Sequence, residues 1–246
     1  MSSTLPSNYD SLIDSFLADV KNSGRFREQY SQEIGEFLDD LELLSGISVK
    51  DEIQNLILQD IIQTAQPGLL LLVANSERAS FAHLRTVLEQ VLGFAYFGLH
   101  PSSGRMWKYR SHSIPTGRAK DRDKGVFSRE FVGLSKLALE HSYLKEALMG
   151  LAGRLEESVK GDYGFTSDFV HVNIRAVEGE HLREDPVAKW FGIWKRICSF
   201  LAYSLLLENF EQYMGDSRED LFQTFVDENL SDKHLLDLLR GTEFDD

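Results

Sequence analysis

The chain has 246 residues, 42% of them apolar, and a formal net charge of −13 at neutral pH. This size and composition suit one large domain with a substantial core, and the acidic balance disfavours nucleic-acid binding through bulk charge. The single cysteine excludes an intrachain disulfide and is typical of a cytoplasmic protein. No apolar run approaches the ~20 residues of a membrane span, and the amino terminus lacks the features of a signal peptide. We therefore expect a cytoplasmic protein without a membrane anchor.

Apolar residues recur at helical spacing through most of the chain, and strand signals are nearly absent. Proline is rare, which favours long helices joined by short connections. We predict an all-α protein that forms a single multi-helix bundle. The expected helices span residues 8–22, 25–45, 50–64, 67–99, 128–140, 142–159, 166–173, 187–213, 217–229 and 231–240. Pro67 either opens the fourth of these helices or lies in a kinked continuation of the third.

No internal repeat or composition break marks a second domain. We predict one helical domain over 1–246, with amino-terminal helices over 1–64, a core over 65–213 and acidic helices over 214–246. The acidic carboxy-terminal helices are amphipathic, so they either cap the core or dock on a partner.

Motifs for common catalytic and metal chemistries are absent from the sequence. It contains no phosphate-binding glycine loop, no nucleophile elbow and no zinc-type spacing of His and Cys. We therefore predict neither a cofactor nor a metal. Cys198 lies in apolar sequence and is interpreted as a core thiol, whereas acidic pairs such as Asp39–Asp40 are interpreted as solvated surface.

A basic segment interrupts the acidic chain. Residues 105–129 hold eight Lys or Arg against two acids. The centre of this region, residues 114–125, is polar, lacks periodicity and is predicted as a loop, whereas a helical start around Trp107 and Tyr109 stays open. The segment is either a solvated surface that pairs with neighbouring acids or a region that attracts an anionic partner such as RNA. The basic residues that would steer an anion are Arg105, Lys108, Arg110, Arg118, Lys120, Arg122 and Lys124.

An ion pair is built into the long apolar helix expected over 67–99. Arg85 and Glu89 stand four residues apart, so they share one helical face, and apolar residues at core spacing surround them. Charges in such a stripe are costly unless they are paired or belong to a site. Two interpretations stay open: a structural pair that fixes helix register, or an arginine that holds a phosphate while Glu89 orients it.

A second polar block consists of Tyr163, Ser167, His171 and Arg175, each four residues after the last. In a continuous helix they would share one side, although Gly164 and the β-branched run around His171 weaken helix formation. His171 is either a core histidine with a hydrogen-bonded ring or a general base beside Arg175. The candidate catalytic residues are therefore His171 and Arg175. The candidate binding residues of the polar centre are Arg85, Glu89, Tyr163 and Ser167.

These segments resemble a known family. Residues 84–89 show an LRxxLE pattern, and GDYGFTSDFVH is similar to a YxxLSxxVH block in which Thr166 replaces the leucine. On these motifs, residues 60–210 resemble an uncharacterised helical family related to HEPN domains. The second motif matches at Tyr163, Ser167 and His171. The resemblance implies a HEPN-like core with extra helices at both ends of the chain.

HEPN-like proteins are helical bundles, often dimeric, that are frequent in prokaryotic toxin–antitoxin and phage-defence systems. The catalytic members are similar to metal-independent ribonucleases and use an arginine, a following polar residue and a histidine four to six positions later. The closest match here is Arg175 with His181, where Ala176 stands at the polar position. The resemblance implies a homodimer that belongs to a conflict system.

Two functional hypotheses follow. In the first, the chain is a non-catalytic binding, sensor or regulatory subunit with a protein partner, and its polar centre specifies the core. In the second, the chain is a metal-independent endoribonuclease toxin in which arginine stabilises charge on the phosphate while His171 moves the proton. We prefer the first hypothesis for the activity.

Overall fold

The computed structural model describes residues 24–99, 145–170, 185–209 and 221–230, and every element in these ranges is a helix. The all-α prediction is therefore confirmed. The helices are α2 (Gly24–Gln29), α3 (Ser31–Gly46), α4 (Glu52–Val73), α5 (Glu77–Leu99), α8 (Lys145–Val170), α10 (Pro186–Glu208) and α12 (Leu221–Asn229). The helices predicted over 8–22, 128–140 and 231–240 lie outside the described residues. The division into three parts stays a prediction.

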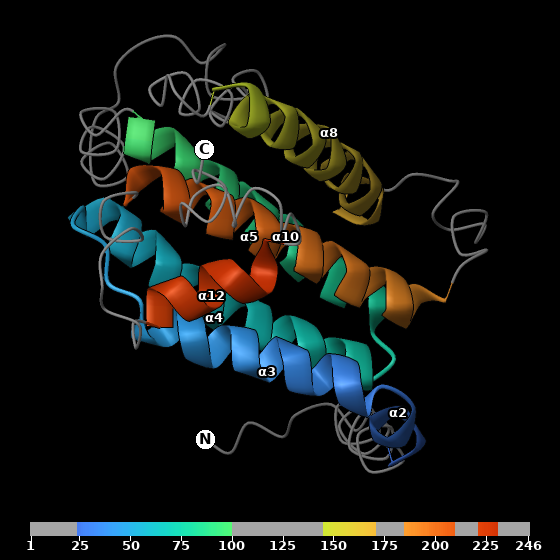
Figure 1. Cartoon of the computed structure of the whole chain (residues 1–246). Coiled ribbons are helices and arrows are strands. Elements are labelled where there is room, and N and C mark those ends of the chain that lie inside the picture. Colours follow the sequence, from blue (N-terminus) through green and yellow to red (C-terminus); the bar gives the residue numbers. More distant parts are fainter. Residues whose placement is uncertain (1–23, 100–144, 171–184, 210–220, 231–246) are drawn as a thin grey trace, which may run out of the picture.

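Helix α10 is the common neighbour in the bundle, since it packs against α3, α5, α8 and α12. Helix α4 packs along α5, and α3 contacts α4, α10 and α12 (Figure 1). Helix α8 lies at the opposite edge from α3, where it packs against α5 and α10 (Figure 1). Two different sets of contacts therefore meet on α10, one towards α3 and α12 and one towards α8.

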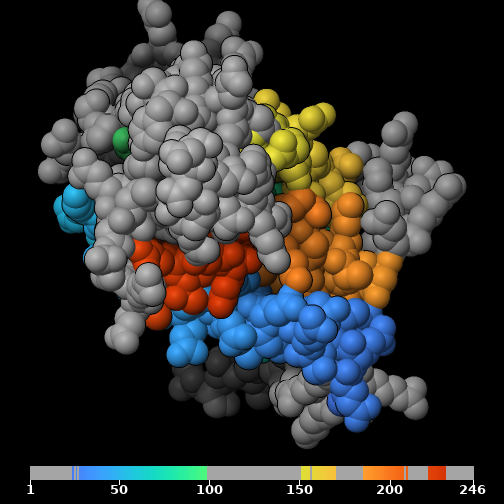
Figure 2. All heavy atoms as spheres, viewed as in Figure 1, coloured from blue at the N-terminus to red at the C-terminus, as the bar shows by residue number. Residues whose placement is uncertain are grey.

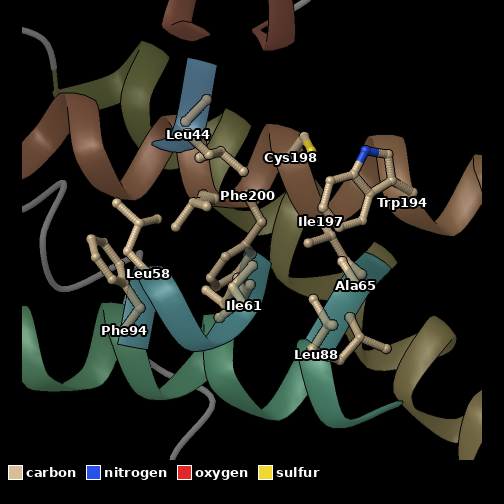
Figure 3. Packing of buried hydrophobic residues seen from close by; sticks show 14 of the residues in the cluster. Leu44, Leu58, Ile61, Ala65, Leu88, Phe94, Trp194, Ile197, Cys198 and Phe200 are labelled. Atoms are coloured by element: carbon tan, nitrogen blue, oxygen red, sulfur yellow. The ribbon is translucent and has the colours of Figure 1, made fainter. Parts of the chain in front are cut away.

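The buried apolar side chains of these helices form one cluster. Figure 3 shows Ile61 of α4, Leu88 of α5 and Ile197 of α10 within it. Trp190 and Trp194 of α10 are among its largest fully buried side chains. Burial of side chains of this size supplies the main favourable free energy of folding.

The helix predicted over 67–99 is two helices, so that prediction is wrong in its boundaries. Helix α4 passes through Pro67 to Val73, which confirms the alternative of a continuation from the preceding helix. The chain then turns at Asn75, whose φ of 57° lies in the left-handed region that asparagine tolerates. The backbone N–H of Asn75 donates to Leu72 O at 3.0 Å. The turn was missed because neither glycine nor proline marks it.

Helix α8 is longer than predicted, since it runs through Gly161 and Gly164 to Val170 without the expected break. Glycine inside a helix costs about 1 kcal/mol relative to alanine. Aromatic packing offsets this cost, because Phe81 of α5 stacks on Phe169 with ring centroids 4.5 Å apart. Tertiary contact therefore overrides the local propensity.

Two aspartates begin helices that frame the core. The Asp51 carboxylate accepts from the backbone N–H groups of Ile53 and Gln54 at the start of α4. Asp185 caps α10 by accepting from Val187 N at 2.9 Å, with Pro186 in the first turn. These caps fix where the two apolar helices enter the bundle.

Helix α4 is, within the described ranges, the one helix long and apolar enough to cross a membrane by length and composition. It packs along α5 and contributes Ile57, Ile61 and Leu69 to the core. Its apolar composition is therefore also what a core helix of this bundle requires.

Candidate functional site

Four of the predicted polar residues meet where α5 faces α8, and we call this group the Arg85 cluster. Arg85 and Glu89 come from α5, and Tyr163 and Ser167 come from α8. Each pair is spaced four residues apart, so each lies on one face of its helix. Because α5 and α8 pack together, the two faces join.

Arg85 is held from three directions in this cluster. Its Nε donates to Ser167 Oγ at 2.9 Å, and its guanidinium carbon lies 3.3 Å from the centroid of the Tyr163 ring. Its Nη1 lies 2.7 Å from Glu89 Oε1. Nη1 is fully buried and makes no aligned hydrogen bond. The contact with Glu89 is therefore an ion pair at short distance whose geometry is not that of a hydrogen bond. The whole Arg85 side chain is 12% exposed.

The two α8 side chains have fixed roles towards Arg85. Ser167 Oγ donates to Tyr163 O at 2.6 Å, so its hydroxyl proton is engaged and its oxygen is available to accept from Arg85. The Tyr163 hydroxyl lies 3.4 Å from Glu89 Oε1. Burial raises the pKa of Tyr163 above its ordinary value of 10.0, and the Arg85 charge acts against this effect. The phenol is therefore protonated at neutral pH and is no general base.

Further cationic side chains attach α8 beside this cluster. Arg196 of α10 makes a bidentate pair with Asp162, with contacts of 2.6 and 2.8 Å. Arg78 Nε donates to Phe169 O at 3.1 Å, in the last turn of α8. Arginines from two neighbouring helices thus hold the carboxy-terminal half of α8.

The other predicted site residues are not placed. His171 and Arg175 follow the end of α8 and lie outside the described residues, as do His181 and all seven basic residues of the steering segment 105–129. Of the seven histidines in the sequence, His83 alone falls in a described range. Its Nδ1 lies 3.2 Å from Thr64 O on α4. The catalytic assignment therefore stays a prediction.

The chemistry available to the Arg85 cluster is limited by its internal pairing. The guanidinium charge is already balanced by Glu89, and within the described residues the hydrogen bonds of Ser167 go to Arg85 and to Tyr163 O, with no histidine or carboxylate. Within those same residues, no group of three or more His, Cys, Asp or Glu side chains could hold a metal ion. As it stands, the cluster orients two helices and holds a cation between them.

A second buried polar group, around Asp40 of α3, was missed in the sequence. Asp40 is only 9% exposed, so the interpretation of this residue as solvated surface is wrong. Its Oδ2 accepts from Trp194 Nε1 at 2.9 Å, and its Oδ1 accepts from Asn229 Nδ2 at 3.0 Å. The spacing of Asp40 from Phe37 and Leu44 is that of a buried helical face, and this was the signal that could have found it.

Comparison of the chain with family models, with curated proteins and with solved structures gives no match. The HEPN resemblance therefore rests on the two short motifs in the sequence. An all-α architecture is compatible with many unrelated activities, so the fold adds no functional assignment by itself.

Proposed function

We propose that this chain is a HEPN-like helical subunit of a prokaryotic defence or toxin–antitoxin system that acts by binding, as a sensor or regulatory component. In this proposal it works in the cytoplasm, forms a homodimer and takes a protein partner. The Arg85 cluster holds α8 in place, and it is not a catalytic centre.

The internal pairing of Arg85 is the observation that supports this proposal. An arginine that stabilises phosphate charge needs its donors directed at the substrate. Here Arg85 is engaged by residues of its own chain, through the stacking on Tyr163, the hydrogen bond to Ser167 and the ion pair with Glu89. A substrate would have to displace Glu89 to reach a side chain that is 12% exposed. The engagement of Arg85 with partners in the same chain is what favours a structural role over phosphate binding.

The ribonuclease alternative has one observation in its favour. Arg78 and Arg85 both contact the last turns of α8, through Phe169 O and Ser167 Oγ. His171 follows the last residue of this helix directly in the sequence. An arginine and a histidine are the side chains that a metal-independent phosphodiester cleavage would use.

An RNA cleavage assay in a metal chelator separates the two candidates. We expect no cleavage by the purified chain above a buffer control. Cleavage by the wild type that is lost in both His171→Ala and Arg175→Ala would overturn our proposal and support the ribonuclease. Equal cleavage by all three proteins would show that His171 and Arg175 are not the catalytic residues of that cleavage.

The binding role is tested by co-expression with the products of the adjacent genes. We expect a stable complex on size-exclusion chromatography and a dimeric mass for the chain alone by light scattering. A monomer that forms no complex with any neighbouring gene product would count against the proposal. Arg85→Lys keeps the positive charge but loses the stacking on Tyr163. It is the folded variant whose complex formation is compared with that of the wild type.

A further inference from the structure

The carboxylate of Asp40 is bound by neutral donors from two other helices. Trp194 and Cys198 of α10 both approach its Oδ2, at 2.9 and 3.6 Å, and Asn229 of α12 donates to its Oδ1 at 3.0 Å. Figure 3 shows the ring nitrogen of Trp194 and the sulfur of Cys198 pointing the same way from α10. None of these three partners carries a positive charge, so the groups that contact an ionised Asp40 stabilise it by hydrogen bonds and without an ion pair.

Helix α12 depends on this contact at its carboxy-terminal end. Asn229 is its last residue, and Ser199 Oγ of α10 donates to the backbone oxygen of Asn229 at 2.8 Å. Along the rest of α12, Phe222, Phe225 and Val226 are buried against the bundle. In the space-filling view, α12 lies between α3 and α10 (Figure 2). A nine-residue helix is not stable by itself, so these tertiary contacts hold it.

Among the residues that the structure describes, the charged groups facing this junction are mostly acidic. Asp39 of α3 and Asp227 and Glu228 of α12 act on the same region as Asp40. The cation that acts on Asp40, Lys195 of α10, is itself paired with Glu36 of α3. Within the described ranges, an ionised Asp40 therefore adds negative charge to a junction whose cation is already paired.

Asp40 can keep a hydrogen bond to Asn229 in both protonation states. The Asn229 side chain carries an N–H donor and an oxygen acceptor, so its amide can turn to accept from a protonated Oδ1, in exchange for the bond that its Nδ2 now makes to Phe225 O. Trp194 Nε1 remains bonded to Oδ2 in either state. The docked helix can thus take up a proton from solvent without losing its contact to α3.

We propose that α12 is a proton-linked latch, which docks more firmly on α3 and α10 when Asp40 is protonated and loosens when Asp40 ionises. This inference is independent of the proposed function. Burial raises the pKa of Asp40 above its ordinary 3.8, and the hydrogen bonds from Asn229 and Trp194 offset this only in part. Partial desolvation and the charge of Asp40 also raise the pKa of Glu228, although its side chain remains exposed.

The direction of the pH effect follows from these shifts. Between the ordinary value of 3.8 and the raised pKa, the docked state holds a proton that the released state, with Asp40 in water, has already lost. Docking therefore weakens as the pH rises through the raised pKa, and it strengthens as the pH falls below the raised pKa towards 3.8. One linked proton changes the docking equilibrium by at most about tenfold per pH unit.

The single cysteine provides the probe. Cys198 is buried, and its Sγ lies 3.6 Å from Asp40 Oδ2, so a thiol reagent reaches it after this junction opens. The labelling rate of the full chain, divided by the rate of the urea-unfolded chain at the same pH, measures the opening. On acidification from about pH 7.5 to about pH 4, towards the ordinary pKa of 3.8, we expect this ratio to fall severalfold, by at most about tenfold per pH unit for each linked proton. A ratio that does not change with pH would overturn the proposal.

Two variants assign the effect to Asp40. We expect Asp40→Asn to remove most of the pH dependence of Cys198 labelling, with Glu228 as the source of the remainder. We expect Asp162→Asn to leave the pH dependence unchanged, because Asp162 is paired with Arg196 on the far side of α10. Glu228→Gln, at an exposed position, should reduce the pH dependence without threatening folding. A full pH dependence in both Asp40→Asn and Glu228→Gln would contradict the latch.

Hydrogen exchange of the wild type separates release of α12 from global unfolding. We expect the protection factors of α12 amides to rise on acidification while those of α5 stay nearly constant. If the amides of both helices follow the same pH dependence, the linked proton belongs to unfolding of the whole bundle, and the latch is refuted.

Discussion

The two sides of α10 bury carboxylates in different ways. Towards α8, Asp162 is held by a bidentate pair with Arg196. Towards α3 and α12, Asp40 is held by neutral donors, with Trp194 and Asn229 in hydrogen-bond contact. A cationic partner supplies both charge and direction, whereas neutral donors supply direction alone. The difference teaches that the α8 side is fixed by charge pairs, and that the α12 side is open to control by protonation.

Removal of the cation from the α8 side has the largest expected effect. Arg196→Ala leaves Asp162 as a carboxylate with 8% side-chain exposure and no arginine partner. We expect a loss of about 2–3 kcal/mol in the free energy of unfolding, less than the ~3–5 kcal/mol of a fully buried pair because Arg196 is itself 36% exposed. Urea denaturation at neutral pH measures this.

Asn229→Ala is the matched change on the other side, since it removes one neutral donor of Asp40 and leaves the others. We expect it to cost about 1 kcal/mol. If Asn229→Ala destabilises the chain more than Arg196→Ala does, the proposed contrast between charge pairing and neutral donors fails.

A smaller loss of stability is expected when the positive charge at position 85 is kept but the planar guanidinium group is lost. Arg85→Lys retains the positive charge near Glu89, but it loses the planar contact with Tyr163 and the Nε bond to Ser167. We expect the midpoint of thermal unfolding to fall by an amount equivalent to about 1 kcal/mol. A variant as stable as the wild type would show that charge alone holds α8, with Ser167→Ala as the control for the single hydrogen bond.

The smallest expected effect tests the packing around Gly164 of α8. A Cβ atom at Gly164 would meet nothing within 4 Å, so Gly164→Ala is sterically free. We expect it to stabilise the chain by about 0.5–1 kcal/mol through the reduced entropy of the unfolded state.

Gly68→Ala provides the opposite case for this measurement. Its Cβ would lie 3.2 Å from His83 Cβ and 3.4 Å from Trp190 Cζ2, where α4, α5 and α10 approach closely. We expect this variant to lose stability, because packed side chains would have to shift. Urea denaturation measures the free energy of unfolding of both variants. A more stable Gly68→Ala variant, or a less stable Gly164→Ala variant, would contradict the packing described at these two positions.

Much of the local structure could be predicted from the amino-acid sequence. Helical spacing of apolar side chains identified the core helices, and the four-residue spacing of Arg85 and Glu89 predicted their pairing on one face. The burial of Cys198 was likewise predicted from its apolar neighbours and is confirmed. The turn at Asn75 was not predicted, because its left-handed conformation carries no glycine signal.

The sequence by itself determined that the chain is helical and which side chains share a helical face, because both depend on residues within one or two turns. Only the tertiary structure decided that Tyr163 and Ser167 meet Arg85, and that Asp40 meets Trp194 and Asn229 instead of water. The partner of a polar group is set by the packing of helices distant in the chain, and periodicity carries no record of that packing.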